Sequence, residues 1–194
     1  MMTPKILVLS GSDRSGSFNK RLARAAAKTL ALIEPDVTMI ALADYPLPLL
    51  GQDGQRDKGL PDKAVKLAGM IAAHDALFVA SPEYNASIPP VLKNALDWVS
   101  LVSSDGRAGV RPFEGLTVAL ASASGEKQGG HRVLDHLRTV FVRLGALVVS
   151  ETCLVPDAAN GFDEDDMPSD EIRAADLNAA CRALVEHCTP GRAR

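Results

Sequence analysis

The sequence has little cysteine and no strong excess of charge of either sign. Its three cysteines, Cys153, Cys181 and Cys188, are odd in number and scattered in spacing. This pattern argues against a disulfide framework, and it lacks the paired spacing of a zinc site. A reducing, cytoplasmic setting is therefore the simplest expectation.

Long apolar runs and a basic excess are also missing. No run approaches the length needed to cross a bilayer, so we expect no membrane partner. The N-terminus lacks the apolar stretch and cleavage site of a signal peptide. Because 21 Lys and Arg residues face 24 Asp and Glu residues, the net charge is −3, and nothing indicates a nucleic-acid partner.

Five short apolar segments predict the strands of one sheet. Lys5–Ser10 is apolar at nearly every position, which is typical of a strand buried on both faces. The other predicted strands are 37–40, 76–80, 116–120 and 146–149. Apolar residues at helical spacing predict helices at about 22–33, 62–73, 91–99, 133–144 and 169–186. This alternation indicates an α/β sandwich with a parallel sheet, and residues 1–194 are interpreted as one domain with long loops at 44–59 and 161–168.

The loop Ser10–Asn19 follows the first strand and leads into the first helix. It contains two glycines, the polar side chains Ser12, Ser15, Ser17 and Asn19, and the cation Arg14. A helix N-terminus favours an anion, so the loop predicts a cradle for one phosphate group. The G-x-G-x-x-G and Gly-Lys-Ser/Thr motifs are absent, so a phosphomonoester such as FMN fits better than a dinucleotide or ATP. The alternative is a Ser/Gly-rich turn without a ligand.

Two further loops follow the third and fourth predicted strands. Ser81–Pro90 contains three prolines and the aromatic Tyr84, and a stiff loop of this kind suits a flat heteroaromatic ring. Ala121–Gly130 is rich in Ser and Gly and is expected on the other side of that ring. In open parallel sheets, ligands bind beyond the carboxyl ends of the strands, where these loops meet. The alternatives are a turn whose Tyr84 covers the core and a plain flexible connection.

These motifs, in this order, resemble the NADPH-dependent FMN reductase family. The matching segments are Gly11-Ser12-x-Arg14-x-x-Ser17-x-Asn19, Ser81-Pro82-Glu83-Tyr84-Asn85-x-Ser87-x-Pro89, Leu92-Lys93-Asn94-Ala95-x-Asp97-Trp98, and the third loop with Arg132 and Leu137-Arg138. Two departures are Asp13, where an uncharged residue is expected, and a third loop that is about one residue longer. We expect the Asp13 carboxylate to face water.

The resemblance implies a flavodoxin-like fold with strand order 2-1-3-4-5 and a bound FMN. It implies FMN phosphate at Ser12, Arg14, Ser17 and Asn19. It implies the flavin ring against Pro82, Glu83, Tyr84 and Asn85, with Ser122, Ser124 and Gly125 across from it. Members form homodimers or homotetramers and pass electrons from NADPH or NADH to quinones, azo compounds, metal oxyanions or free flavin.

No catalytic acid or base is predicted, because a bound flavin would carry the chemistry itself. His131 and Asp135 are four residues apart but no further ligand accompanies them, so no metal site is expected. Two other functions stay open from the sequence. One is a non-enzymatic electron carrier of flavodoxin type, and the other is a binding protein that has lost the flavin.

Overall fold

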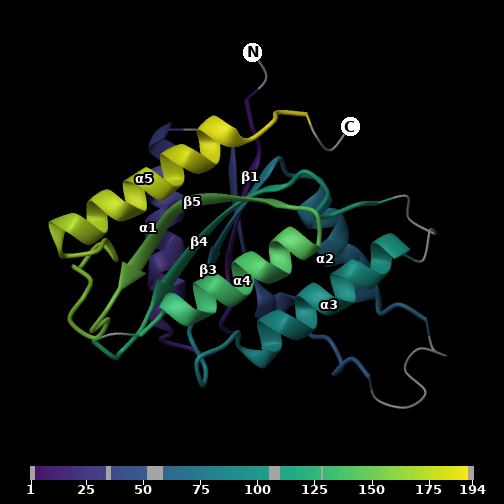
Figure 1. The fold of residues 1–194 in the computed structure, drawn as a ribbon, viewed down its shortest axis with the longest axis horizontal. Helices are drawn as coiled ribbons and strands as arrows, with labels where there is room; N and C mark the ends of the chain where they lie inside the picture. Colours follow the sequence, from purple (N-terminus) through teal and green to yellow (C-terminus); the bar gives the residue numbers. More distant parts are fainter. Residues whose placement is uncertain (1–2, 34–35, 52–58, 105–109, 128, 192–194) are drawn as a thin grey trace.

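The computed structural model describes residues 3–33, 36–51, 59–104, 110–127 and 129–191. A five-stranded parallel sheet lies at its centre, in the order β2-β1-β3-β4-β5 (Figure 1). The strands are β1 (Ile6–Ser10), β2 (Val37–Ala41), β3 (Ala76–Ala80), β4 (Thr117–Ala123) and β5 (Leu147–Val155). The predicted α/β class and the strand order implied by the resemblance are both confirmed.

Helices cover both faces of the sheet (Figure 1). One face carries α1 (Phe18–Ile33) and α5 (Glu171–His187), and the other carries α2 (Asp62–Ala72), α3 (Pro90–Ser104) and α4 (His131–Arg143). A short 3-10 helix, η1 (Leu42–Asp44), follows β2. In the described part of the chain, no helix is both long and apolar enough to cross a bilayer.

The three central strands explain the continuous apolar runs of the sequence. Every residue of β1, β3 and β4 is buried, because each strand has helices above and below it. Phe78 of β3 lies in the layer beneath α1 and α5, whereas Trp98 and Phe141 fill the opposite layer. Burial of such side chains is the main source of the fold's stability.

Strand β5 is longer than predicted because a bulge interrupts its apolar pattern. Between Val118 and Leu120 of β4, the partner strand advances from Val148 to Thr152. Arg138 of α4 donates hydrogen bonds to the carbonyls of Val148 (3.1 Å) and Val149 (2.8 Å). The guanidinium therefore satisfies backbone acceptors where the ladder shifts register.

Candidate functional site

The parallel register brings the three predicted loops to one edge of the sheet. Ser10 at the end of β1 pairs with Ala80 of β3, and Ala80 pairs with Ala121 of β4. Strand order reverses between β1 and β3, which is where open α/β sheets bind ligands. The loops after β1, β3 and β4 therefore begin side by side, as the sequence predicts.

The first loop is tightly packed at Gly11 and has open space around Gly16. The Gly11 N–H donates to the Ala80 carbonyl at 2.8 Å, and a Cβ on Gly11 would come within 2.8 Å of Leu92 Cδ2. Gly16 has a positive φ of 70° and open space around it. Ser12 is buried, Ser17 is half-buried, and Arg14 is exposed. This arrangement forms a turn that a phosphate can approach.

The N-terminus of α1 is the part of this loop whose geometry suits an anion. The first turn of α1 contains no acidic residue, as is also true of α3 and α4, whereas α2 begins with Asp62 and α5 with Glu171 after its N-cap Asp170. The leading N–H groups of a helix lack intrahelical acceptors, and the helix dipole adds positive potential. Asp13 is exposed, as expected, and the Lys20 ammonium donates to its backbone carbonyl at 3.0 Å.

Asn19 joins the first loop to the third. Its Nδ2 donates to the Ala123 carbonyl at 2.7 Å, and its Oδ1 accepts the Ala123 N–H at 2.9 Å. The side chain is buried within the protein, so it fixes the first turn of α1 against the end of β4. What Asn19 offers to an anion is its backbone N–H in that first turn.

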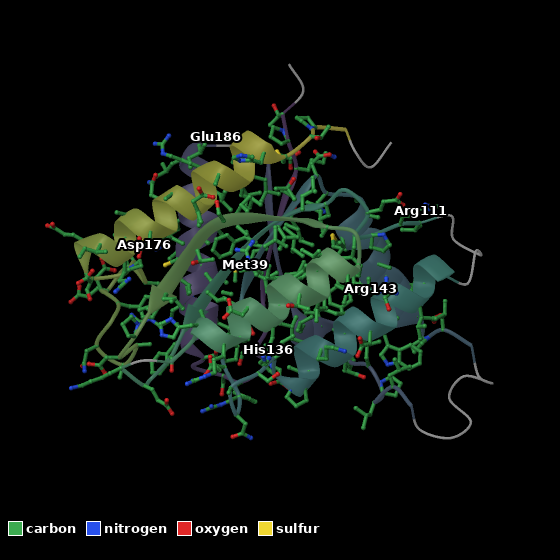
Figure 2. The ribbon with its side chains drawn as sticks, viewed as in Figure 1. Met39, Arg111, His136, Arg143, Asp176 and Glu186 are labelled. Carbon is green, nitrogen blue, oxygen red and sulfur yellow. The ribbon has the colours of Figure 1, made fainter. Side chains whose placement is uncertain are left out.

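The second loop forms a closed turn that projects from the edge. Tyr84 and Ser87 exchange two backbone hydrogen bonds of 3.0 Å, and Asn85 and Ala86 have positive φ angles of 48° and 62°. These are the features of a type I′ turn. Tyr84 is 39% exposed, so its ring does not serve as core. Ser87 Oγ lies 3.0 Å from His136 Nδ1, which attaches the turn to α4 (His136 is labelled in Figure 2).

Glu83 connects the second loop to the third. Its Oε2 accepts the N–H groups of Gly130 and Val133, each at 3.2 Å, and its Oε1 lies 3.4 Å from Arg132 Nη1. The carboxylate therefore caps α4 from another loop, which the N-cap residue Gly130 cannot do itself. Its side chain is only 10% exposed. The Glu83 carboxylate thus fixes the second loop against the end of the third loop.

The third loop contains a buried polar atom without a partner. Ser122 Oγ is buried and makes no hydrogen bond among the described residues. A Cβ on Gly130 would come within 2.9 Å of it, and one on Gly129 would collide with Ser124. Ser124 Oγ accepts the Glu126 N–H at 3.1 Å, while Gly125 is exposed. The loop is longer than the family pattern in the stretch Glu126-Lys127-Gln128, of which Gln128 lies outside the described residues.

The residues present therefore fit a phosphate-bearing, flat-ringed cofactor. Three features lie at the predicted edge of the sheet: the open turn at Gly16, the N-terminus of α1, which has no acidic residue in its first turn, and the Ser122 hydroxyl, which makes no hydrogen bond among the described residues. No cluster of three or more His, Cys, Asp or Glu side chains within the described ranges is arranged to hold a metal ion. The sequence did not indicate the capping by Glu83 or the bond to His136, because both join residues about 50 positions apart.

The strand order and the three loops at the carboxyl edge of the sheet define a flavodoxin-like α/β protein. Known proteins share this architecture. The model of the NADPH-dependent FMN reductase family matches residues 4–160, and the chain belongs to that family. It is an NAD(P)H-dependent flavin oxidoreductase.

Three known proteins illustrate the similarity. A quinone reductase of Escherichia coli is 35% identical over 147 residues, which cover 76% of this chain and 74% of that protein. A 2-hydroxy-1,4-benzoquinone reductase of a Burkholderia species is 44% identical over 150 residues, covering 77% and 76%. The structure of FerB, a flavoenzyme NAD(P)H:(acceptor) oxidoreductase of Paracoccus denitrificans, superposes with a TM-score of 0.76 at 26% identity, covering 96% of this chain and 100% of that one.

Proposed function

We propose that this protein binds FMN at the carboxyl edge of the sheet, with the phosphate at the N-terminus of α1. Ser12, Arg14 and Ser17 supply two hydroxyls and a cation, and Asn19 supplies its backbone N–H. The single observation that carries this assignment is the loop that leads into α1, which has open space at Gly16 and is followed by a helical turn without a carboxylate.

The flavin ring is proposed to lie between the second and third loops. Pro82, Glu83, Tyr84 and Asn85 form one side through the closed turn and its backbone. Ser122, Ser124 and Gly125 form the other side. Glu83 would also hold the two loops together, because its carboxylate accepts the N–H groups of Gly130 and Val133. Support comes from the buried Ser122 hydroxyl, which lacks a protein partner.

FMN held at these residues would supply the redox chemistry: hydride acceptance from NADPH or NADH and electron transfer to a small acceptor. The protein's residues hold the phosphate, orient the ring and keep the loops apart. Quinones and azo compounds are the proposed acceptors, and the quinones are supported by relatives that are named quinone reductases. We further propose one domain over residues 1–194, a cytoplasmic location, and a homodimer or homotetramer.

Titration of flavin-stripped protein with FMN tests the phosphate assignment. The double variant Arg14→Ala/Ser17→Ala removes two contacts to a charged group, so its Kd for FMN is expected to rise at least about 100-fold. The matched control is Arg143→Ala/Ser150→Ala, which removes the same residue types at exposed positions of α4 and β5. In Figure 2, Arg143 is labelled farther along α4 than His136.

Each outcome of this titration has a distinct meaning. Equal affinity of the Arg14/Ser17 variant and the control would refute the phosphate site. Absence of FMN uptake by the unmodified protein would favour a flavin-free binding protein. Uptake with single-electron exchange but no steady NAD(P)H turnover would favour an electron carrier.

A further inference from the structure

A segment between β5 and α5 contacts two parts of the proposed FMN site. This segment, residues 157–167, is named the brace. Its residues 161–167 lie beyond the part of the chain that the family model matches, which ends at residue 160. One end of the brace contacts the third loop, and the other end contacts α1.

The first end of the brace supports the third loop. The Ala158 N–H donates to the Ser124 carbonyl at 2.9 Å, and the Asp157 N–H donates to the Glu126 carbonyl at 3.3 Å. Ala158 is fully buried in the layer beneath α1 and α5, which anchors this end. The position of Ser124, a residue of the proposed ring site, therefore depends on the brace.

Internal hydrogen bonds fix the shape of the second end. Asp163 Oδ1 accepts the N–H groups of Asp165 (2.9 Å) and Met167 (2.8 Å), and the Asp163 N–H donates to the Met167 carbonyl at 2.9 Å. Asp166 lies within this turn with a φ of 64°, a left-handed conformation that Asp and Asn tolerate better than most residues. The turn therefore presents the Asp166 carboxylate in a defined place.

The Asp166 carboxylate binds two arginines of α1. Its Oδ1 accepts a hydrogen bond from Arg21 Nε at 2.6 Å, and its Oδ2 accepts one from Arg24 Nε at 2.7 Å. Arg21 Nη2 also donates to the Asp163 carbonyl at 2.8 Å, and the Arg21 guanidinium lies 4.9 Å from the centre of the Phe162 ring. Charge-assisted hydrogen bonds of this length are about twice as strong as neutral ones. The brace therefore holds α1 by several contacts that converge on Arg21.

Arg21 connects this ion pair to the proposed phosphate site. It lies in the first turn of α1, and its backbone N–H donates to the Ser17 carbonyl at 3.3 Å. Asn19 in the same turn bonds to Ala123 at the end of β4. A phosphate at this turn needs Ser17 and the leading N–H groups in one orientation, and contacts behind the binding groups maintain such an orientation. Asp166 is placed to do this without touching the ligand.

We propose that Asp166 is a positioning residue for FMN binding, which holds the first turn of α1 in place relative to the third loop through the brace. The inference rests on the proposed function, because it assumes the phosphate at that turn and the ring at that loop. A role in stability alone would leave the Kd for FMN unchanged. FMN binds folded protein, and a modest loss of stability leaves nearly all of the chain folded.

Titration of flavin-stripped Asp166→Asn with FMN tests the proposal. Asparagine keeps an acceptor oxygen and tolerates the positive φ, so the change removes mainly the charge. The Kd for FMN is expected to rise about fivefold. Asp176→Asn is the matched control, because Asp176 pairs with Arg173 at 3.0 Å within α5 and outside the brace (Asp176 is labelled in Figure 2). Its Kd should equal that of the unmodified protein.

Two variants of Arg24 probe the same ion pair from α1. Arg24→Gln should raise the Kd for FMN about threefold, whereas Arg24→Lys keeps a cation beside Asp166 and should restore most of the affinity. The double variant Arg24→Gln/Asp166→Asn should bind FMN no more weakly than Asp166→Asn alone, because both changes remove one shared contact.

Amide exchange in flavin-free protein tests the brace without the cofactor. Asp166→Asn should speed exchange at Arg21 and Ala158, whose N–H groups donate to the carbonyls of Ser17 and Ser124. Exchange in α2, on the other face of the sheet, should stay unchanged. Unchanged exchange at Arg21 and Ala158 would overturn the link through the brace.

The titrations separate failure of the positioning role from failure of the proposed function. A Kd for Asp166→Asn equal to that of the control would overturn the positioning role alone. Equal losses of affinity in Arg24→Gln and Arg24→Lys would also overturn it, since the charge at this position would then have no effect. Failure of the unmodified protein to bind FMN would reject the proposed function, and the positioning role with it.

Discussion

Replacement of Glu83 tests how the two ring-flanking loops are held together. Glu83→Ala removes an acceptor of two backbone N–H groups and a carboxylate at the N-terminus of α4. Loss of an N-cap costs about 0.5–2 kcal/mol, and the helix dipole adds up to about 2 kcal/mol at partly buried sites. Since the two bonds are long, we expect a loss of about 2 kcal/mol. This corresponds to a Tm lower by about 6 °C for a domain of this size.

The assay combines thermal unfolding with FMN titration of each variant. Glu83→Gln keeps an acceptor oxygen but loses the charge, so about half of the destabilisation is expected. Asp170→Ala is the matched control: the Asp170 carboxylate accepts the Arg173 N–H at 3.0 Å and caps α5, whose first turn lies outside the proposed flavin site. Glu83→Ala should raise the FMN Kd about tenfold, whereas Asp170→Ala should lower Tm only. Equal effects of the two variants on FMN affinity would refute the link between Glu83 and the ring site.

Three further predictions concern stability and reactivity. The Arg24 and Arg21 guanidinium groups lower the pKa of Asp166, so this carboxylate stabilises the fold above the ordinary Asp pKa and loses that effect as pH falls through the lowered value. Asp166→Asn should cost about 1 kcal/mol in urea unfolding at pH 7 and nothing at strongly acid pH; a constant difference would contradict this. Burial raises the pKa of the Cys153 and Cys181 thiols to about 12, so neither should be labelled by a thiol reagent in native protein at pH 8, while both should be in urea. Arg138→Ala should lower the free energy of unfolding by about 2 kcal/mol, with faster amide exchange in β5, because two bulge carbonyls lose their donor; exchange unchanged in β5 would exclude that role.

The fold was predictable because its strongest signals are local. A run such as Lys5–Ser10 is apolar at nearly every position only if both faces of its strand are buried, and β1 confirms this. The predicted fifth strand was too short, since Ser150 and Glu151 break the apolar run at the bulge and are exposed. The last helix begins at Glu171 rather than Ser169, because Asp170 and not Ser169 caps it.

The candidate site was predictable in its loops but not in its contacts. Small polar residues after buried strands mark the ligand-binding edge of a parallel sheet. Residue type alone does not reveal that the Asn19 amide bonds to Ala123, 104 positions away, or that Glu83 caps α4. Such pairings depend on how separate loops meet in space, and no local spacing encodes them.

FMN-dependent turnover is the most direct test of the proposed function. Flavin-stripped protein would be mixed with NAD(P)H and benzoquinone, and NAD(P)H oxidation would be followed as FMN is added. We expect no oxidation above background without FMN, and a rate that saturates at one FMN per chain. A rate that is independent of FMN, or one that stays at background at every FMN concentration, would contradict an FMN-dependent reductase.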